Sequence, residues 1–169
     1  MGMFLTSVAF RPNEKIDWNT VRAEIAKCCI GDNNLTDNLY QQANGYAIVS
    51  PYGEEGALLA QLAPYISELI KDYVVLATCV DSDFNILELY YNGQCVESCS
   101  IGSVYEDVFE GLPGKPNLEK WKLLLLDPSQ EDALRDAMFG NEIFAEDMLR
   151  KLSALTALPI FNDELVMGG

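Results

Sequence analysis

The stretch from residue 73 to residue 101 constrains the fold of this chain more than any other part of the sequence. Residues 73–80 are mostly apolar and β-branched, and two further strand-like runs follow at 84–91 and 94–101. Asn92-Gly93 separates the last two runs, and this dipeptide is typical of a type I′ turn because both residues accept a positive φ. The stretch therefore predicts a three-stranded antiparallel meander.

Apolar periodicity predicts the remaining elements on either side of the meander. We expect strands at 4–10 and 46–50, helices at 18–29, 54–71, 118–126 and 128–139, and a last helix that Asn141 caps and that ends near residue 157. Pro64 predicts a kink or a break in the second helix, because proline removes a backbone donor. The order β-α-β-α-β-β-β-α-α-α predicts a single α+β domain over residues 1–169, with a mixed, mainly antiparallel sheet of about five strands and helices packed on one face.

The chain is strongly acidic, with 26 Asp and Glu against 11 Lys and Arg and a formal net charge of −15. An acidic surface repels nucleic-acid phosphates and anionic lipids, so neither is an expected partner. It attracts a basic protein, although high net charge can also serve solubility alone. No apolar run approaches the length of a membrane span, and five cysteines without a secretory signal indicate reduced thiols, so we expect a cytoplasmic protein.

The sequence lacks the residues of the common catalytic sites. It contains no histidine, which excludes His-dependent triads and imidazole-bound zinc. It also lacks the glycine-rich dinucleotide and nucleotide motifs and the nucleophile elbow. We therefore expect no cofactor and favour a function other than catalysis.

Two pairs of carboxylates are the weak candidates for a divalent cation. The carboxylates of Asp81 and Asp83 are spaced closely enough to share a metal ion. The same spacing also suits the hairpin turn expected there, and we favour the turn. Glu88 and Glu97 would lie directly opposite each other if the turn at 92–93 sets a regular register. Their side chains would then either splay into water or together bind a cation or a basic side chain.

The same register predicts the cross-strand pairs Tyr90–Cys95 and Ile86–Cys99 on the outward face of the hairpin. The opposite face would then supply core residues, which are Leu87, Leu89 and Val96. Cys95 and Cys99 are four residues apart on one strand, about 13 Å at the usual rise, which is too far to chelate one ion together. We therefore expect no zinc site on this face.

The segment 102–117 has no regular pattern of its own, and long irregular segments often carry function. Five of its residues bring aromatic rings and carboxylates together, and they are the predicted partner contacts: Tyr105, Glu106, Asp107, Phe109 and Glu110. Rings among acids suit a basic, partly apolar protein surface. The alternative is a loop whose rings fold back onto the core beneath an acidic rim.

Two classes of function remain open from the sequence. The favoured one is a non-enzymatic, acidic protein-binding domain, of the inhibitor or immunity type, that engages a basic partner. The alternative is a small-molecule- or divalent-metal-binding domain, or an enzyme, built on Asp81, Asp83, Glu88 and Glu97. That alternative requires a concave pocket with convergent carboxylates.

Replacing Tyr105 and Phe109 together by alanine should weaken partner binding and leave the melting temperature nearly unchanged, because contact residues on a loop add little to a core. Binding is read by pull-down and stability by thermal melting of the same preparation. A large fall in melting temperature would place both rings in the core instead.

Overall fold

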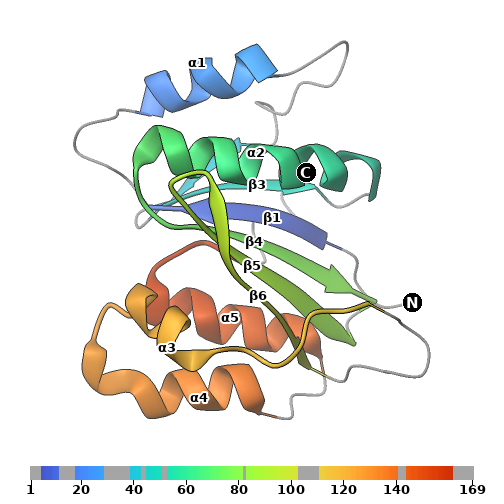
Figure 1. Cartoon of the computed structure of the whole chain (residues 1–169), viewed down its shortest axis with the longest axis vertical. Helices are drawn as coiled ribbons and strands as arrows, with labels where there is room; N and C mark the ends of the chain where they lie inside the picture. The colour runs from blue at the N-terminus through green and yellow to red at the C-terminus, as the bar shows by residue number, and fades with distance from the viewer. Residues whose placement is uncertain are drawn as a thin grey trace.

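Six strands form one antiparallel sheet in the computed structural model, which describes residues 5–11, 18–28, 39–42, 45–50, 53–81, 83–102, 111–140 and 144–161. The strands lie in the order β2-β3-β1-β4-β5-β6, and each adjacent pair is antiparallel (Figure 1). Their bounds are β1 Leu5–Phe10, β2 Leu39–Gln42, β3 Gly45–Ser50, β4 Val74–Val80, β5 Phe84–Tyr91 and β6 Gln94–Gly102.

Helices cover both faces of this sheet. α1 and α2 lie on one side, and α3, α4 and α5 lie on the other (Figure 1). The bounds are α1 Trp18–Cys28, α2 Gly53–Ile70, α3 Leu118–Trp121, α4 Glu131–Phe139 and α5 Ala145–Thr156, with 3-10 turns at Lys122–Leu124 and Pro128–Gln130. Within the described ranges, no helix combines the length and the apolar character that crossing a membrane requires.

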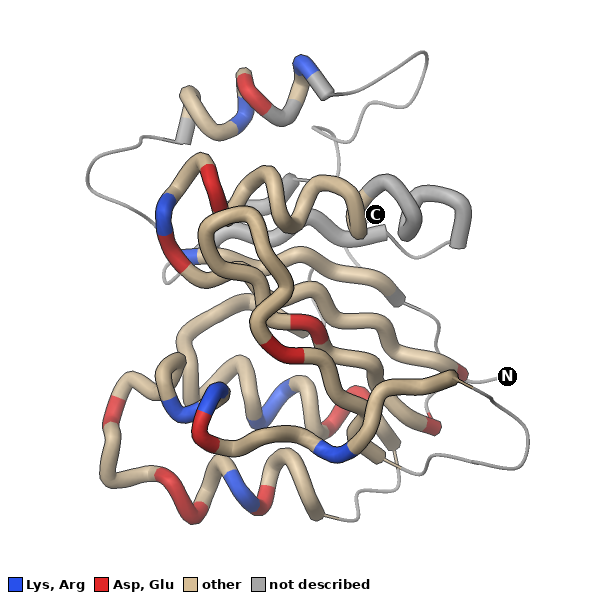
Figure 2. Tube along the Cα trace, in the orientation of Figure 1, with Lys and Arg blue, Asp and Glu red and all other residues tan. Residues whose placement is uncertain are grey.

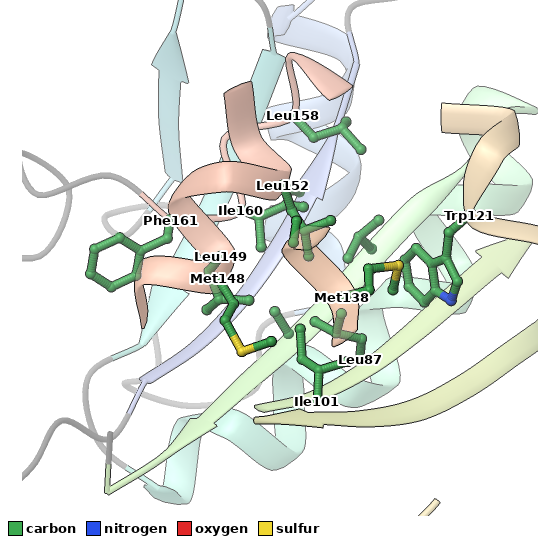
Figure 3. Packing of buried hydrophobic residues seen from close by; sticks show 14 of the residues in the cluster. Leu87, Ile101, Trp121, Met138, Met148, Leu149, Leu152, Leu158, Ile160 and Phe161 are labelled. Atoms are coloured by element: carbon green, nitrogen blue, oxygen red, sulfur yellow. The ribbon is translucent and has the colours of Figure 1, made fainter. Parts of the chain in front are cut away.

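The alternation of side chains along β4 shows why both faces are covered. Val74 and Leu76 pack under α2 with Ile66, whereas Val75 and Ala77 pack on the other side with residues of α4 and α5. A strand buried on both faces reads as a continuous apolar run, as β4 does. Figure 3 shows the core beneath α5 with these residues labelled: Leu87, Ile101, Trp121, Met138, Met148, Leu149, Leu152, Leu158, Ile160 and Phe161.

The meander is confirmed, and its second turn has the predicted form. Asn92 and Gly93 have φ angles of 52° and 83°, as a type I′ turn requires. The expectation of helices on one face was wrong, because odd and even positions of β4 are equally apolar and each set needs a cover. The sheet is also fully antiparallel rather than mixed, and it gains a sixth strand at β2, whose short Leu-Tyr-Gln-Gln sequence carries little apolar signal.

Pro64 lies inside α2 without ending it, so of the two predicted alternatives, a kink or a break, the break does not occur. The flanking residues Ala63 and Ile66 are fully buried against the sheet. Burial of the apolar face of the helix between Leu59 and Ile70 therefore offsets the backbone hydrogen bond that proline removes. The hydroxyl of Ser67 donates to the Pro64 carbonyl over 2.7 Å.

Arg11 joins the end of β1 to the far helical layer. Its Nη2 donates to the carbonyl of Leu124 and, over 2.8 Å, to the carbonyl of Thr156 in the last turn of α5. Burial lowers the pKa of this guanidinium below its usual value, and the nearby Asp72 carboxylate offsets only part of that effect. The cation thus serves carbonyls at a helix C-terminus, where the helix dipole favours positive charge.

Replacing Arg11 by methionine should lower the free energy of unfolding by about 2–3 kcal/mol, because two partly buried carbonyls lose a charged donor. Urea denaturation measures this. The matched control is Arg22→Met on the exposed side of α1, which should change stability by less than about 0.5 kcal/mol. Equal effects at the two positions would contradict the role assigned to Arg11.

Candidate functional site

The predicted contact residues Tyr105, Glu106, Asp107, Phe109 and Glu110 lie outside the described residues. The second part of the same long segment, from 111 to 117, is described and packs along β6. The amide of Ser100 donates to the carbonyl of Gly114 over 2.8 Å, and Pro116 is buried. This part of the segment therefore lies against the sheet.

Asp81 and Asp83 form the turn between β4 and β5, as predicted. The amide of Asp83 donates to the carbonyl of Val80 over 2.9 Å, and Asp81 has a φ of 50°. Glu88 lies five residues further along β5, about 17 Å away at the rise of an extended strand. Across the described part of the chain, no three Asp, Glu or Cys side chains come close enough to hold one metal ion, so the four candidate carboxylates do not converge.

The predicted pairing of Glu88 with Glu97 does not occur. Tyr90 pairs with Cys95 as expected, but the register between β5 and β6 then shifts by one residue. Beyond the shift, Leu89 is opposite Glu97 and Glu88 is opposite Ser98. The physical reason is a β-bulge, which places one extra residue on β6 at Val96 and reverses the alternation of side chains after it.

The bulge also separates the two cysteines that the regular register placed on one face. Cys95 is exposed on the α2 side, whereas Cys99 is buried in the core beneath α5. The pair Ile86–Cys99 is replaced by Leu87–Cys99. Leu87, Leu89 and Val96 do pack in or against the core beneath α5, as predicted.

Glu97 is engaged in holding α3 to the sheet. Its Oε2 accepts hydrogen bonds from Nε1 of Trp121 over 2.7 Å and from the amide of Asn117 over 3.0 Å. Its Oε1 accepts from the amide of Ser98 over 3.2 Å. With both oxygens occupied by the chain itself, Glu97 has a structural role that the sequence pattern did not reveal.

Glu88 lies half-buried on the opposite face, beside Tyr90 and Cys95. The Tyr90 hydroxyl donates to Oε2 of Glu88 over 3.0 Å. Burial, together with the Glu88 charge, raises the pKa of Tyr90 well above its usual range and also raises the pKa of the Cys95 thiol. Both groups are therefore protonated at neutral pH, which suits neither a general base nor a thiolate nucleophile.

The tip of the β5–β6 hairpin rests on the C-terminal part of α2. The amide of Gly93 donates to the hydroxyl of Ser67 over 2.9 Å. A Cβ atom at Gly93 would lie 3.3 Å from Oε2 of Glu68, so this exposed carboxylate is next to the turn. We call Glu68, Glu88, Tyr90 and Cys95 together the acidic hairpin face. No sequence pattern indicates that α2 brings Glu68 to this turn.

Charge is distributed unevenly along the sequence, and Figure 2 shows the acidic and basic residues on the described trace. Residues 53–102, which hold α2 and the meander, contain eight acids and one base, Lys71, a net charge of −7. Residues 111–161 contain eight acids and six bases, a net charge of −2. In that second part, ion pairs such as Lys122–Glu131 at 3.3 Å offset the acids locally. The acidic hairpin face therefore lies within the more negative of these two segments of the chain.

Comparison of the chain with family models, with curated proteins and with solved structures finds no match. An α+β fold by itself does not determine a function. The chemistry of the acidic hairpin face is therefore the basis for a functional conclusion. That face offers a half-buried carboxylate and an exposed one, a tyrosine ring and a protonated thiol, which together accept hydrogen bonds and positive charge.

Removing the charge of Glu88 should lower the pKa of Cys95, because that charge opposes formation of the thiolate. In Glu88→Gln, iodoacetamide should modify Cys95 faster at a fixed pH below the midpoint, and the midpoint of rate against pH should move down. Peptide mass spectrometry follows this residue separately from the other cysteines. Glu119→Gln, on exposed α3, is the control and should leave the midpoint in place; an equal shift in both variants would contradict the local effect.

Proposed function

We propose that this protein is a non-enzymatic binding domain that engages a basic protein partner through the acidic hairpin face. The observation that carries the proposal is the position of Glu88, a half-buried carboxylate on a sheet face within the part of the chain that has a net charge of −7. A carboxylate that is partly shielded from water binds a cation more strongly than one on an open surface.

The chemistry of the face supports binding rather than catalysis. Burial and the Glu88 charge keep the Cys95 thiol protonated and hold the Tyr90 hydroxyl in its donor form. A nucleophile or a general base needs the opposite shift of pKa. A receptor for a basic side chain needs only an acceptor, which Glu88 provides, and a ring or aliphatic surface beside it.

The partner chemistry that fits is an Arg or Lys side chain on a partly apolar surface. A guanidinium can bond to the free lone pairs of the Glu88 carboxylate while its stem contacts the Tyr90 ring. Glu68, at the hairpin tip, would receive a second basic group. Such an arrangement is the one expected of an inhibitor or immunity-type protein, and residues 105–110 remain a second predicted contact region.

The test is a pull-down from the lysate of the source organism at low and at high salt, followed by affinity measurements on the recovered protein. A basic protein should be recovered at low salt and released at high salt, because screening weakens charge pairing. The double variant Glu68→Gln, Glu88→Gln should bind that protein about tenfold more weakly, since two such pairs contribute about 1.4 kcal/mol together.

The matched control is Glu119→Gln with Asp132→Asn, which removes the same charge from the α3–α4 surface. It should retain nearly the affinity of the unmodified chain. Equal weakening by the two double variants would show that only the overall charge matters. A partner that is acidic, or whose binding does not respond to salt, would also contradict the proposal.

A further inference from the structure

β6 is an edge strand, and its outer side is occupied by the chain itself. The sheet ends at β6, so alternate backbone groups of this strand point away from β5. The amides of Ser98 and Ser100 are two of these outward groups. An uncovered edge of this length would be open to another strand, because unpaired amides and carbonyls favour strand addition.

Residues 113–117, which we call the strap, cover that edge. The segment leading into α3 runs alongside β6 (Figure 1). The amide of Ser100 donates to Gly114 over 2.8 Å, and its hydroxyl donates to the carbonyl of Pro113 over 2.7 Å. The strap therefore satisfies the outward amide of Ser100 with a backbone carbonyl, as a neighbouring strand would.

Glu97 fastens the other end of the strap. Its carboxylate accepts hydrogen bonds from the amide of Asn117, the last strap residue, and from the indole of Trp121 one helical turn later. The same carboxylate accepts from the amide of Ser98, one of the outward groups of the edge. Hydrogen bonds to an ionised acceptor are stronger than neutral ones, so one side chain both blocks the edge and anchors its cover.

We propose that the strap is a built-in edge cover latched by Glu97, and that its release exposes β6 to strand addition by a second copy of the chain. The bulge at Val96 makes the latch possible, because it turns Glu97 toward α3. Two copies of one edge strand can pair antiparallel about a two-fold axis, which forms a closed dimer. With a net charge of −15 on each copy, this association must strengthen as salt is added, since screening reduces the repulsion.

Native-state hydrogen exchange tests the latch in Glu97→Ala, with Glu88→Ala as the matched control. Glu88 is on the neighbouring strand, opposite Ser98, but its side chain lies on the other face. In Glu97→Ala the amide of Ser100 should exchange at least about tenfold faster, because its acceptor on the strap is freed. The amide of Val75 on β4, a central strand paired on both sides, reports global stability and should lose much less protection.

Sedimentation at rising protein concentration, with and without added salt, tests the exposed edge. Glu97→Ala should form dimers that strengthen with salt, whereas the unmodified chain and Glu88→Ala should not. Trp121→Phe removes one of the hydrogen-bond donors to Glu97. Its dimerisation should therefore be intermediate between that of Glu97→Ala and that of the unmodified chain. The proposal is overturned if Ser100 keeps its protection in Glu97→Ala, if it loses protection only in step with Val75, or if the opened variant stays monomeric at every salt concentration.

Discussion

The structure depends on a sheet that must bury side chains on both of its faces. β4 shows the constraint most directly, since Val74 and Leu76 pack under α2 while Val75 and Ala77 pack toward α5. Neither helical layer could be removed without exposing half of this strand to water. Charged groups therefore lie at the edges of the two helical layers, as Glu88 and Glu97 do.

The bulge at Val96 decides what those two glutamates do. In a regular ladder they would face each other and repel. One extra residue instead turns Glu97 toward Trp121, where it becomes a structural acceptor, and leaves Glu88 on the α2 side with Tyr90. A single irregularity thus yields a closed sheet edge on one side and an available carboxylate on the other.

Much of the fold could be predicted from local sequence. The meander, the Asn92-Gly93 turn and most helix limits follow from periodicity and turn chemistry. The two-sided packing was missed because an apolar run such as β4 does not by itself indicate whether helices cover one face of the sheet or both. β2 was missed because its four residues are half polar.

The site was predictable only in part. Glu88 was identified as a candidate from hairpin geometry, but the pattern paired it with Glu97, because no residue at the bulge position signals an extra insertion. Glu68 could not be linked to the hairpin, since that contact joins positions distant in sequence. The same holds for Arg11, whose partners Leu124 and Thr156 lie more than 100 residues away.

The central claim, that positive charge is received at the acidic hairpin face, is tested most directly by a nuclear magnetic resonance titration of the isotope-labelled chain. The probe is a short peptide that alternates arginine with apolar residues, added at low salt. We predict shifts of the amides of Glu68, Glu88 and Cys95 at peptide concentrations that leave α4 and α5 unchanged. Equal shifts at Glu119 and Asp132, or none at the hairpin, would contradict the account.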